Sequence, residues 1–185
     1  MIQNKEELKQ YIASDNKDYR APRFKQRLVS AYAHYPMHEI KKYLKLLRRQ
    51  EYCINTAGGN KLKGLLGLYY ERRKNLLGRK LGFEISPNCC GKGLTIEHIG
   101  SIIINYHARI GENCRLHGAN CIGNNGKTQG VPKIGNNVDI GYGAVVIGDI
   151  EIADDVVIGA NAVVNKSVTI PGSIVVGVPA ARKGS

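Results

Sequence analysis

One short stretch of the chain combines a histidine with carboxylates. His98 directly follows Glu97, and Glu84 lies 14 residues earlier. An imidazole titrates near neutral pH, so it can take a proton from a hydroxyl group without special tuning. A carboxylate on the other ring nitrogen would hold the tautomer that this task requires. These residue types predict general-base chemistry at His98, with Glu84 as the orienting group.

The elements that must position these residues follow a period of six. An aliphatic residue recurs at every sixth position, with one interruption, at Ile104, Ile110, Leu116, Ile122, Ile134, Ile140, Val146, Ile152, Ile158, Val164, Ile170 and Val176. His98 lies six residues before Ile104, which predicts that its ring occupies a place where other turns carry an aliphatic side chain. Glycine follows the aliphatic residue at Gly111, Gly123, Gly135, Gly141, Gly159 and Gly177, where we expect corners with positive φ.

A six-residue period fits neither the period of a strand nor that of a helix. It is typical of a parallel β-helix, in which short strands meet at tight corners and the aliphatic side chains point inward. The alternative is a sandwich of short antiparallel strands, but its turns would not keep one phase over so many repeats. We therefore predict a mainly β chain built on a parallel β-helix.

The segment 123–133 interrupts the repeat and is rich in Gly, Asn and Pro. Insertions into solenoids usually lie on the working face, so this segment is predicted to be a loop at the functional site. A loop without a functional role is the alternative, because long surface loops cost little entropy.

The charge of the protein is confined to its first part. The chain has 185 residues and a formal net charge of +12. Residues 1–80 hold 19 Lys and Arg against 7 Asp and Glu, an excess of 12, and the remaining residues balance at 8 against 8. The charge and the period together predict a basic α-helical N-terminal domain over 1–80 and a β-helical domain over 81–185.

Four helices are predicted in the basic part. Asn4 and Glu7 form a capping-box-like start for a helix that ends near Ala13. The other three are expected at Pro22–His34, at Met37–Tyr52 and, capped by Asn60, through Leu77.

The sequence shows neither a membrane-spanning stretch nor a signal peptide, so we expect a cytoplasmic protein. Reduced thiols are then expected at Cys53, Cys89, Cys90, Cys114 and Cys121. Cys89 and Cys90 are adjacent, but they lack a second Cys or His pair at ligand spacing, and no metal is predicted.

The basic helices raise nucleic acid as a partner. Their charges are spread without a recognition motif, so no nucleic acid is predicted. A solvated face, contact with an anionic cofactor or substrate, or at most peripheral attraction to anionic lipid are the uses left open.

Three stretches carry a family resemblance: Gly82–Asn88, Gly93–Gly100 and the closing Val176–Ala180. They resemble the hexapeptide acyltransferases, and within them the serine acetyltransferase branch and its relatives encoded with surface-polysaccharide genes. The resemblance covers about residues 80–183. It implies a left-handed β-helix, a homotrimer that could pair into a dimer of trimers, and acetyl-CoA bound in the groove between neighbouring coils.

The resemblance also implies roles for single residues. His98 matches the catalytic base, Glu84 the acidic residue that orients it, and Glu97 the acidic neighbour. Both acids are Glu where that family has Asp, and the spacing between them is one residue shorter. Glu97, His117 and Asn105 are assigned to the acceptor. Acetyl-CoA is assigned to Gly143, Ala144 and Ala160, and its phosphates to Lys166, Arg182 and Lys183.

The acceptor follows from a departure from the family. Serine acetyltransferases carry an Arg-His pair before the Pro-Lys-Ile that ends the loop, whereas this chain reads Gln129-Gly130-Val131. A serine carboxylate would lose its obvious partner, whereas a sugar hydroxyl would not need one. An O-acetyltransferase for a saccharide or polysaccharide precursor is therefore the main prediction, and L-serine O-acetylation is the alternative.

Two other classes are weaker alternatives. The γ-class carbonic anhydrases are zinc enzymes on the same fold, but they pair two ligand histidines a few residues apart, and the repeat here has no such pair. A β-helix that serves only as a scaffold is the non-enzymatic alternative, and it predicts no binding of acetyl-CoA.

Overall fold

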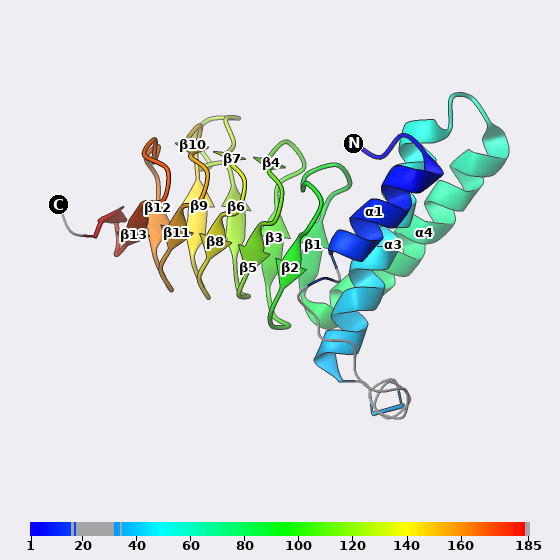
Figure 1. The fold of residues 1–185 in the computed structure, drawn as a ribbon, viewed down its shortest axis with the longest axis horizontal. Coiled ribbons are helices and arrows are strands. Elements are labelled where there is room, and N and C mark those ends of the chain that lie inside the picture. The colour runs from blue at the N-terminus through cyan, green and yellow to red at the C-terminus, as the bar shows by residue number, and fades with distance from the viewer. Residues whose placement is uncertain (16, 18–31, 34, 184–185) are drawn as a thin grey trace.

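The computed structural model describes residues 1–15, 17, 32–33 and 35–183. Three helices lie together at one end: α1 (Lys5–Ser14), α3 (Pro36–Thr56) and α4 (Lys61–Leu81). A coil of short strands extends from them to the C-terminus at the far end (Figure 1). This order of helices and coil is the one predicted from the sequence.

Each strand is only two or three residues long, because the chain turns a corner after every strand. The strands are β1 (Phe83–Ile85), β2 (Thr95–Ile96), β3 (Ile102–Ile104), β4 (Arg109–Ile110), β5 (Arg115–Leu116), β6 (Cys121–Gly123), β7 (Lys133–Ile134), β8 (Asp139–Ile140), β9 (Val145–Ile147), β10 (Glu151–Ile152), β11 (Val157–Ile158), β12 (Val163–Val164), β13 (Ile174–Val176) and β14 (Ala181–Arg182).

The strands form three sheets. Sheet A has the order β1-β3-β6-β9-β12, sheet B has β10-β7-β4, and sheet C has β14-β13-β11-β8-β5-β2. From β2 to β12 the chain passes through sheets C, A and B in turn, which is the winding of a three-sided coil. Among the described strand pairs, only β13 with β14 is antiparallel. The predicted parallel β-helix is confirmed, and the sandwich alternative is wrong.

The interior is the aliphatic column that the period predicts, up to its last two members. Every residue of the series from Ile104 to Val164 is at most 5% exposed. Ile170 and Val176, however, are 50% and 40% exposed, and Val175 is buried in their place. Val175 pairs with Ile158, one residue closer in sequence than the spacing from Ile140 to Ile158. The final coil is one residue short, so the inward position moves by one.

The corner glycines have a different purpose from the one predicted. Of the six that follow an aliphatic residue, only Gly177 has positive φ. Gly111 is needed for close approach instead, since a Cβ there would lie 2.6 Å from a backbone oxygen of the next coil. The left-handed places come two residues later, at Asn113, Asn137 and Asp155.

These left-handed residues also tie the coils to each other. The Asn113 amide donates to the Asn137 side-chain oxygen at 3.0 Å, and the Asn137 amide donates to Asp155 at 2.9 Å. Their short polar side chains both tolerate the left-handed backbone and bond to the neighbouring corner.

The helices begin where the sequence predicts. Asn4 caps α1 by accepting a hydrogen bond from the Glu7 amide at 2.9 Å, and Asn60 caps α4 in the same way through Lys63. Helices α3 and α4 each extend to 21 residues, four residues beyond their predicted ends. The predicted helix at Pro22–His34 lies outside the described residues, apart from positions 32 and 33. No described helix is long and apolar enough to cross a membrane.

A buried ionic cluster joins the helices to the first coil. The Arg48 guanidinium on α3 bonds Asp15 at 2.7 Å and Glu51 at 3.0 Å, and it also donates to the backbone oxygens of Cys90 and Gly91. Asp15, Arg48 and Glu51 are at most 2% exposed. Burial alone would lower the pKa of Arg48, but Glu51 and Asp15 outweigh it, so this pKa is raised.

The boundary between the two parts is short. Helix α4 ends at Leu81, Gly82 caps it in the left-handed conformation, and β1 begins at Phe83. Apolar residues of α3, α4 and the coil belong to one continuous core. The helical part therefore closes the open end of the β-helix.

Candidate active site

His98 lies at one edge of the β-helix. We name this the C–A edge: the corners at residues 97–101, 117–120, 141–144 and 159–162 that join sheet C to sheet A. The first of these corners is two residues longer than the next, since eight residues separate the inward Ile96 from Ile104 and six separate Leu116 from Ile122.

The longer corner changes the place of the imidazole. Ile96, which pairs with Leu116 and is fully buried, takes the inward position. The prediction that His98 replaces an inward aliphatic residue is therefore wrong. The two extra residues carry His98 out of the interior, and it is exposed.

The second corner supports the first. Gly118 lies directly beside His98, since a Cβ on this glycine would be 3.4 Å from the Cβ of His98 and 3.1 Å from the Tyr142 ring. Gly118 has φ of +120°, where side chains are rarely found. Only glycine therefore lets the His98 corner and the half-exposed Tyr142 ring approach each other this closely.

Four polar side chains line the outer face of sheet C next to His98. We name Glu97, Arg115, His117 and Asp139 the sheet C cluster. Arg115 lies 3.5 Å from Glu97 and pairs with Asp139 in the strand register. His117 Nε2 lies 2.7 Å from Asp139 Oδ1, and both of these side chains are 36% exposed. The backbone amide of Glu97 bonds to Leu116, which places Glu97 and His117 side by side.

The predicted partner of His98 lies on a different sheet. Glu84 is exposed in the middle of β1 and pairs with Ile103 in sheet A. Within the described residues, no hydrogen bond or ion pair joins His98 to Glu84 or to another carboxylate. The structure gives a carboxylate partner to His117 instead.

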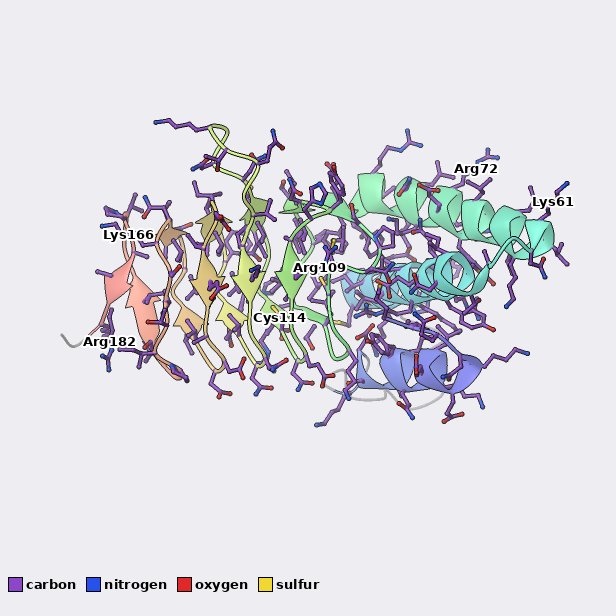
Figure 2. The ribbon with its side chains drawn as sticks, turned by 90° about the horizontal axis from the view of Figure 1, so that it is seen from above. Lys61, Arg72, Arg109, Cys114, Lys166 and Arg182 are labelled. Atoms are coloured by element: carbon purple, nitrogen blue, oxygen red, sulfur yellow. The ribbon has the colours of Figure 1, made fainter. Side chains whose placement is uncertain are left out.

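Asn105 belongs to another edge of the coil. It follows β3 at the corner between sheets A and B, and its side-chain oxygen accepts a hydrogen bond from the His107 amide at 2.9 Å. The same edge carries the loop between Gly123 and Lys133, which projects from the coil (Figure 2). Within one chain, sheet A therefore separates Asn105 from His98.

The small residues assigned to the cofactor do lie on the edge that carries His98. Gly143 is on the third corner and Ala160 on the fourth, and both are accessible. Ala144 is fully buried, with its amide bonded to Gly141 and its carbonyl oxygen to Cys121. Ala144 thus keeps the corner narrow but has no surface to offer a ligand.

The predicted phosphate-binding cations lie at the far end of the β-helix. Figure 2 shows Lys166 and Arg182 at the end opposite the helices. Arg182 lies in β14, paired with Val175, and Lys183 follows it and donates its amide to Ile174. Lys166 follows β12 at the edge between sheets A and B. Arg182 and Lys183 are therefore beside sheet C, on the side of His98, and Lys166 is not.

All five cysteines are free thiols, and four of them are buried. Burial raises the pKa of Cys114 to about 12 and that of Cys89 to about 11. The Cys89 sulfur also donates to the carbonyl oxygens of Asn105 and Tyr106. Neutral buried thiols act as small apolar side chains, and thiolate ligands are not favoured in these surroundings.

The two best-defined surface hollows lie away from His98. One, of about 390 Å³, lies on the outer face of sheet B and is lined by Arg109, Lys133 and Glu151. The other, of about 490 Å³, lies between α3 and α4 and is lined by Lys42, Arg73 and several leucines. His98 thus lies on an open edge of the single chain.

The sequence analysis missed Asp139, Arg115 and Tyr142. A signal for the first two was present, because each directly precedes an inward aliphatic residue, and strand residues next to an inward position face outward. Tyr142 lies between two glycines at a corner, and its packing on Gly118 depends on corners 24 residues apart.

Comparison with known proteins agrees with this geometry. Residues 132–166 match the family described as bacterial transferase hexapeptide (six repeats). The chain is 39% identical over 94 residues to a serine acetyltransferase of Staphylococcus xylosus, a match that covers 45% of this chain and 44% of the relative. The matched region is therefore less than half of that relative's length.

Solved structures extend the similarity to nearly the whole chain. The serine acetyltransferase of Neisseria gonorrhoeae superposes with a TM-score of 0.69 at 26% identity, covering 97% of this chain and 68% of that one. The Brucella abortus serine acetyltransferase in complex with coenzyme A gives a TM-score of 0.65 at 24% identity, over 96% of this chain and 66% of that one. This second similarity shows the fold alone. The repeat region and the chain that folds around it belong to the hexapeptide-repeat acyltransferase family.

Proposed function

We propose that this protein is an acetyl-CoA-dependent O-acetyltransferase and that its acceptor is L-serine. The observation that carries the proposal is the similarity to serine acetyltransferases in both sequence and fold, together with an exposed imidazole at the equivalent corner. The relatives favour the acceptor that the sequence analysis placed second over the saccharide that it placed first.

His98 is the proposed general base. Its ring is exposed on an edge whose later corners, at Gly143 and Ala160, are narrow enough for a flexible cofactor arm to pass. His98 takes the proton of the acceptor hydroxyl while the oxygen attacks the thioester carbonyl. Backbone amides of the edge stabilise the tetrahedral oxyanion, and the proton then passes to the departing CoA thiolate. No covalent acyl-enzyme is needed.

The carboxylate that orients His98 is proposed to be Glu84 or Glu97. Both lie near the first corner and neither bonds the ring in the single chain. Catalytic hydrogen bonds are often long before substrate binds, so this geometry is compatible with either.

Acetyl-CoA is proposed to lie along the C–A edge from His98 towards the end of the β-helix. The coenzyme A complex of the Brucella abortus enzyme supports a site for this cofactor on the shared fold. Arg182 and Lys183 lie at the end of this path, where the phosphates need cations. An open edge on one chain also fits a groove that a neighbouring chain completes, and we propose a homotrimer on this ground.

A saccharide hydroxyl remains the second candidate acceptor. The observation that favours it is the loop, which reads Gln129-Gly130-Val131 where serine acetyltransferases carry an Arg-His pair. A sugar would not need the missing carboxylate partner.

The test compares His98→Ala with His107→Ala, a control at an exposed histidine on another edge. We expect His98→Ala to lower acetyl transfer at least ~10²-fold while thermal stabilisation by CoA persists. The acceptors are L-serine and a panel of sugar nucleotides. Transfer by His98→Ala at the wild-type rate would remove His98 from the mechanism, and turnover of a sugar nucleotide without turnover of serine would reverse the order of the acceptors.

A further inference from the structure

The sheet C cluster contains a second histidine with better local support than His98. His117 Nε2 and Asp139 Oδ1 are 2.7 Å apart, a short hydrogen bond between adjacent coils. An ionised carboxylate only accepts hydrogen bonds, so Nε2 carries the proton in this contact. The Nδ1 lone pair of the neutral ring is then left to accept a hydrogen bond from another group.

The position of this pair relates it to the acceptor and not to the cofactor. His117 stands beside Glu97 on the outer face of sheet C, and Glu97 is the residue before His98. Gly118, the residue after His117, touches the His98 corner. A molecule whose hydroxyl reaches His98 therefore has its neighbouring groups within reach of His117.

The charge of the cluster selects the kind of group. Glu97 and Asp139 supply two negative charges and Arg115 one positive charge, so the cluster with a neutral His117 has a net charge of −1. A group that donates hydrogen bonds and carries a positive charge fits these surroundings, whereas a second carboxylate does not.

The cluster is confined to the coils around His98. On later coils the outer face of the same sheet carries Val157 and Ile174, which are 39% and 44% exposed. A polar surface that served only for solvation would not end where the reactive corner ends.

We propose that His117, positioned by Asp139, binds the ammonium group of an amino-acid acceptor through Nδ1 while His98 deprotonates its hydroxyl. This inference rests on the proposed function, and it adds a specificity residue that replaces part of the recognition missing from the loop. Asp139 acts through His117 as a positioning residue.

The experiment compares L-serine with 3-hydroxypropionate, which has the same hydroxyl and carboxylate but no ammonium. We expect His117→Ala to lower kcat/KM for L-serine about tenfold through KM, and to leave kcat/KM for 3-hydroxypropionate and KM for acetyl-CoA within about twofold. His117→Gln guards against a folding defect and should show the same loss of preference. Asp139→Ala should reproduce part of it and shift the acid limb of the pH profile for L-serine.

The control is His107→Ala, whose ring stacks on Tyr106 at the other edge and has no listed acidic partner among the described contacts. It should keep the preference for L-serine. Unchanged KM for L-serine in both His117 variants would overturn the proposal, and so would a fall in kcat at constant KM, because that would make His117 part of proton transfer. If CoA still stabilises the protein but neither acceptor is turned over, the ammonium subsite fails while the acetyl-CoA half of the proposed function stands.

Discussion

The first three coils and the last two share one interior but differ on the outside. Inward residues of sheet C are buried and aliphatic from Ile96 to Val175. Outward residues of the same sheet are polar on the early coils, as at Arg115 and Asp139, and apolar on the late ones, as at Val157. The repeat therefore specifies the scaffold, and the outward positions are where one coil can differ from another without loss of the fold.

The second contrast concerns regularity. Two corners break the period, the one that carries His98 and the loop after Gly123, and each is an insertion between inward residues that stay in place. A solenoid accepts such insertions because each coil contacts only its neighbours. Insertions thus change the surface and leave the core unchanged.

The largest expected effect would break the joint between helices and coil. Arg48→Ala leaves Asp15 and Glu51 buried without their cation, which costs about 3–5 kcal/mol of unfolding free energy. Arg115→Ala, at the exposed ion pair with Glu97, should cost at most about 1 kcal/mol. Urea titration of both variants measures the difference. Equal midpoints would show that the buried cluster does not hold the helices on the coil.

The next test separates the inner from the outer face of the late coils. Ile158→Ala removes a side chain that is 1% exposed and should cost about 2–5 kcal/mol. Ile174→Ala removes one that is 44% exposed and should cost less than half as much in a dilute, unassembled sample. Thermal unfolding at several protein concentrations is the measurement. A concentration-dependent loss in Ile174→Ala would place that outer face in a contact between chains.

A smaller effect on stability should accompany a clear effect on activity at Gly118. Alanine there is strained at positive φ, which costs about 1–3 kcal/mol, and its methyl group presses on the Tyr142 ring and the His98 corner. We expect acetyl transfer to fall more than ten-fold, about as much as a displaced base costs. Gly126→Ala is the matched control, since Gly126 also has positive φ but no atom within 4 Å. Normal activity in Gly118→Ala would separate His98 from this contact.

The smallest effect tests whether the interior excludes charge. The pKa of Cys114 is raised by burial to about 12 from a value of 9.0. Because the folded state keeps this proton longer than the unfolded state, its stabilising contribution is complete below pH 9 and is lost as pH rises towards 12. Wild-type protein should lose up to about 1.4 kcal/mol more per pH unit in this range than Cys114→Ala. Parallel slopes for the two proteins would show that the thiol ionises as freely in the folded state as in the unfolded one.

Much of the fold was predictable because it depends on local rules. The period of six requires only that an aliphatic side chain return to the interior after each corner, and the caps at Asn4 and Asn60 depend on residues three positions away. The reversal of phase after Val164 was not predictable, because a coil shortened by one residue looks like a continued repeat when both Val175 and Val176 are apolar.

The candidate site was predictable in composition but not in arrangement. The sequence alone singled out His98, Glu97 and His117 as chemically capable residues. Tertiary structure decided that His98 lies outside the core, that Asp139 and not Glu84 holds an imidazole, and that Asn105 belongs to another edge. The reason is that the distance between side chains on different coils is set by the number of residues in each corner, and no local pattern in the chain records that number.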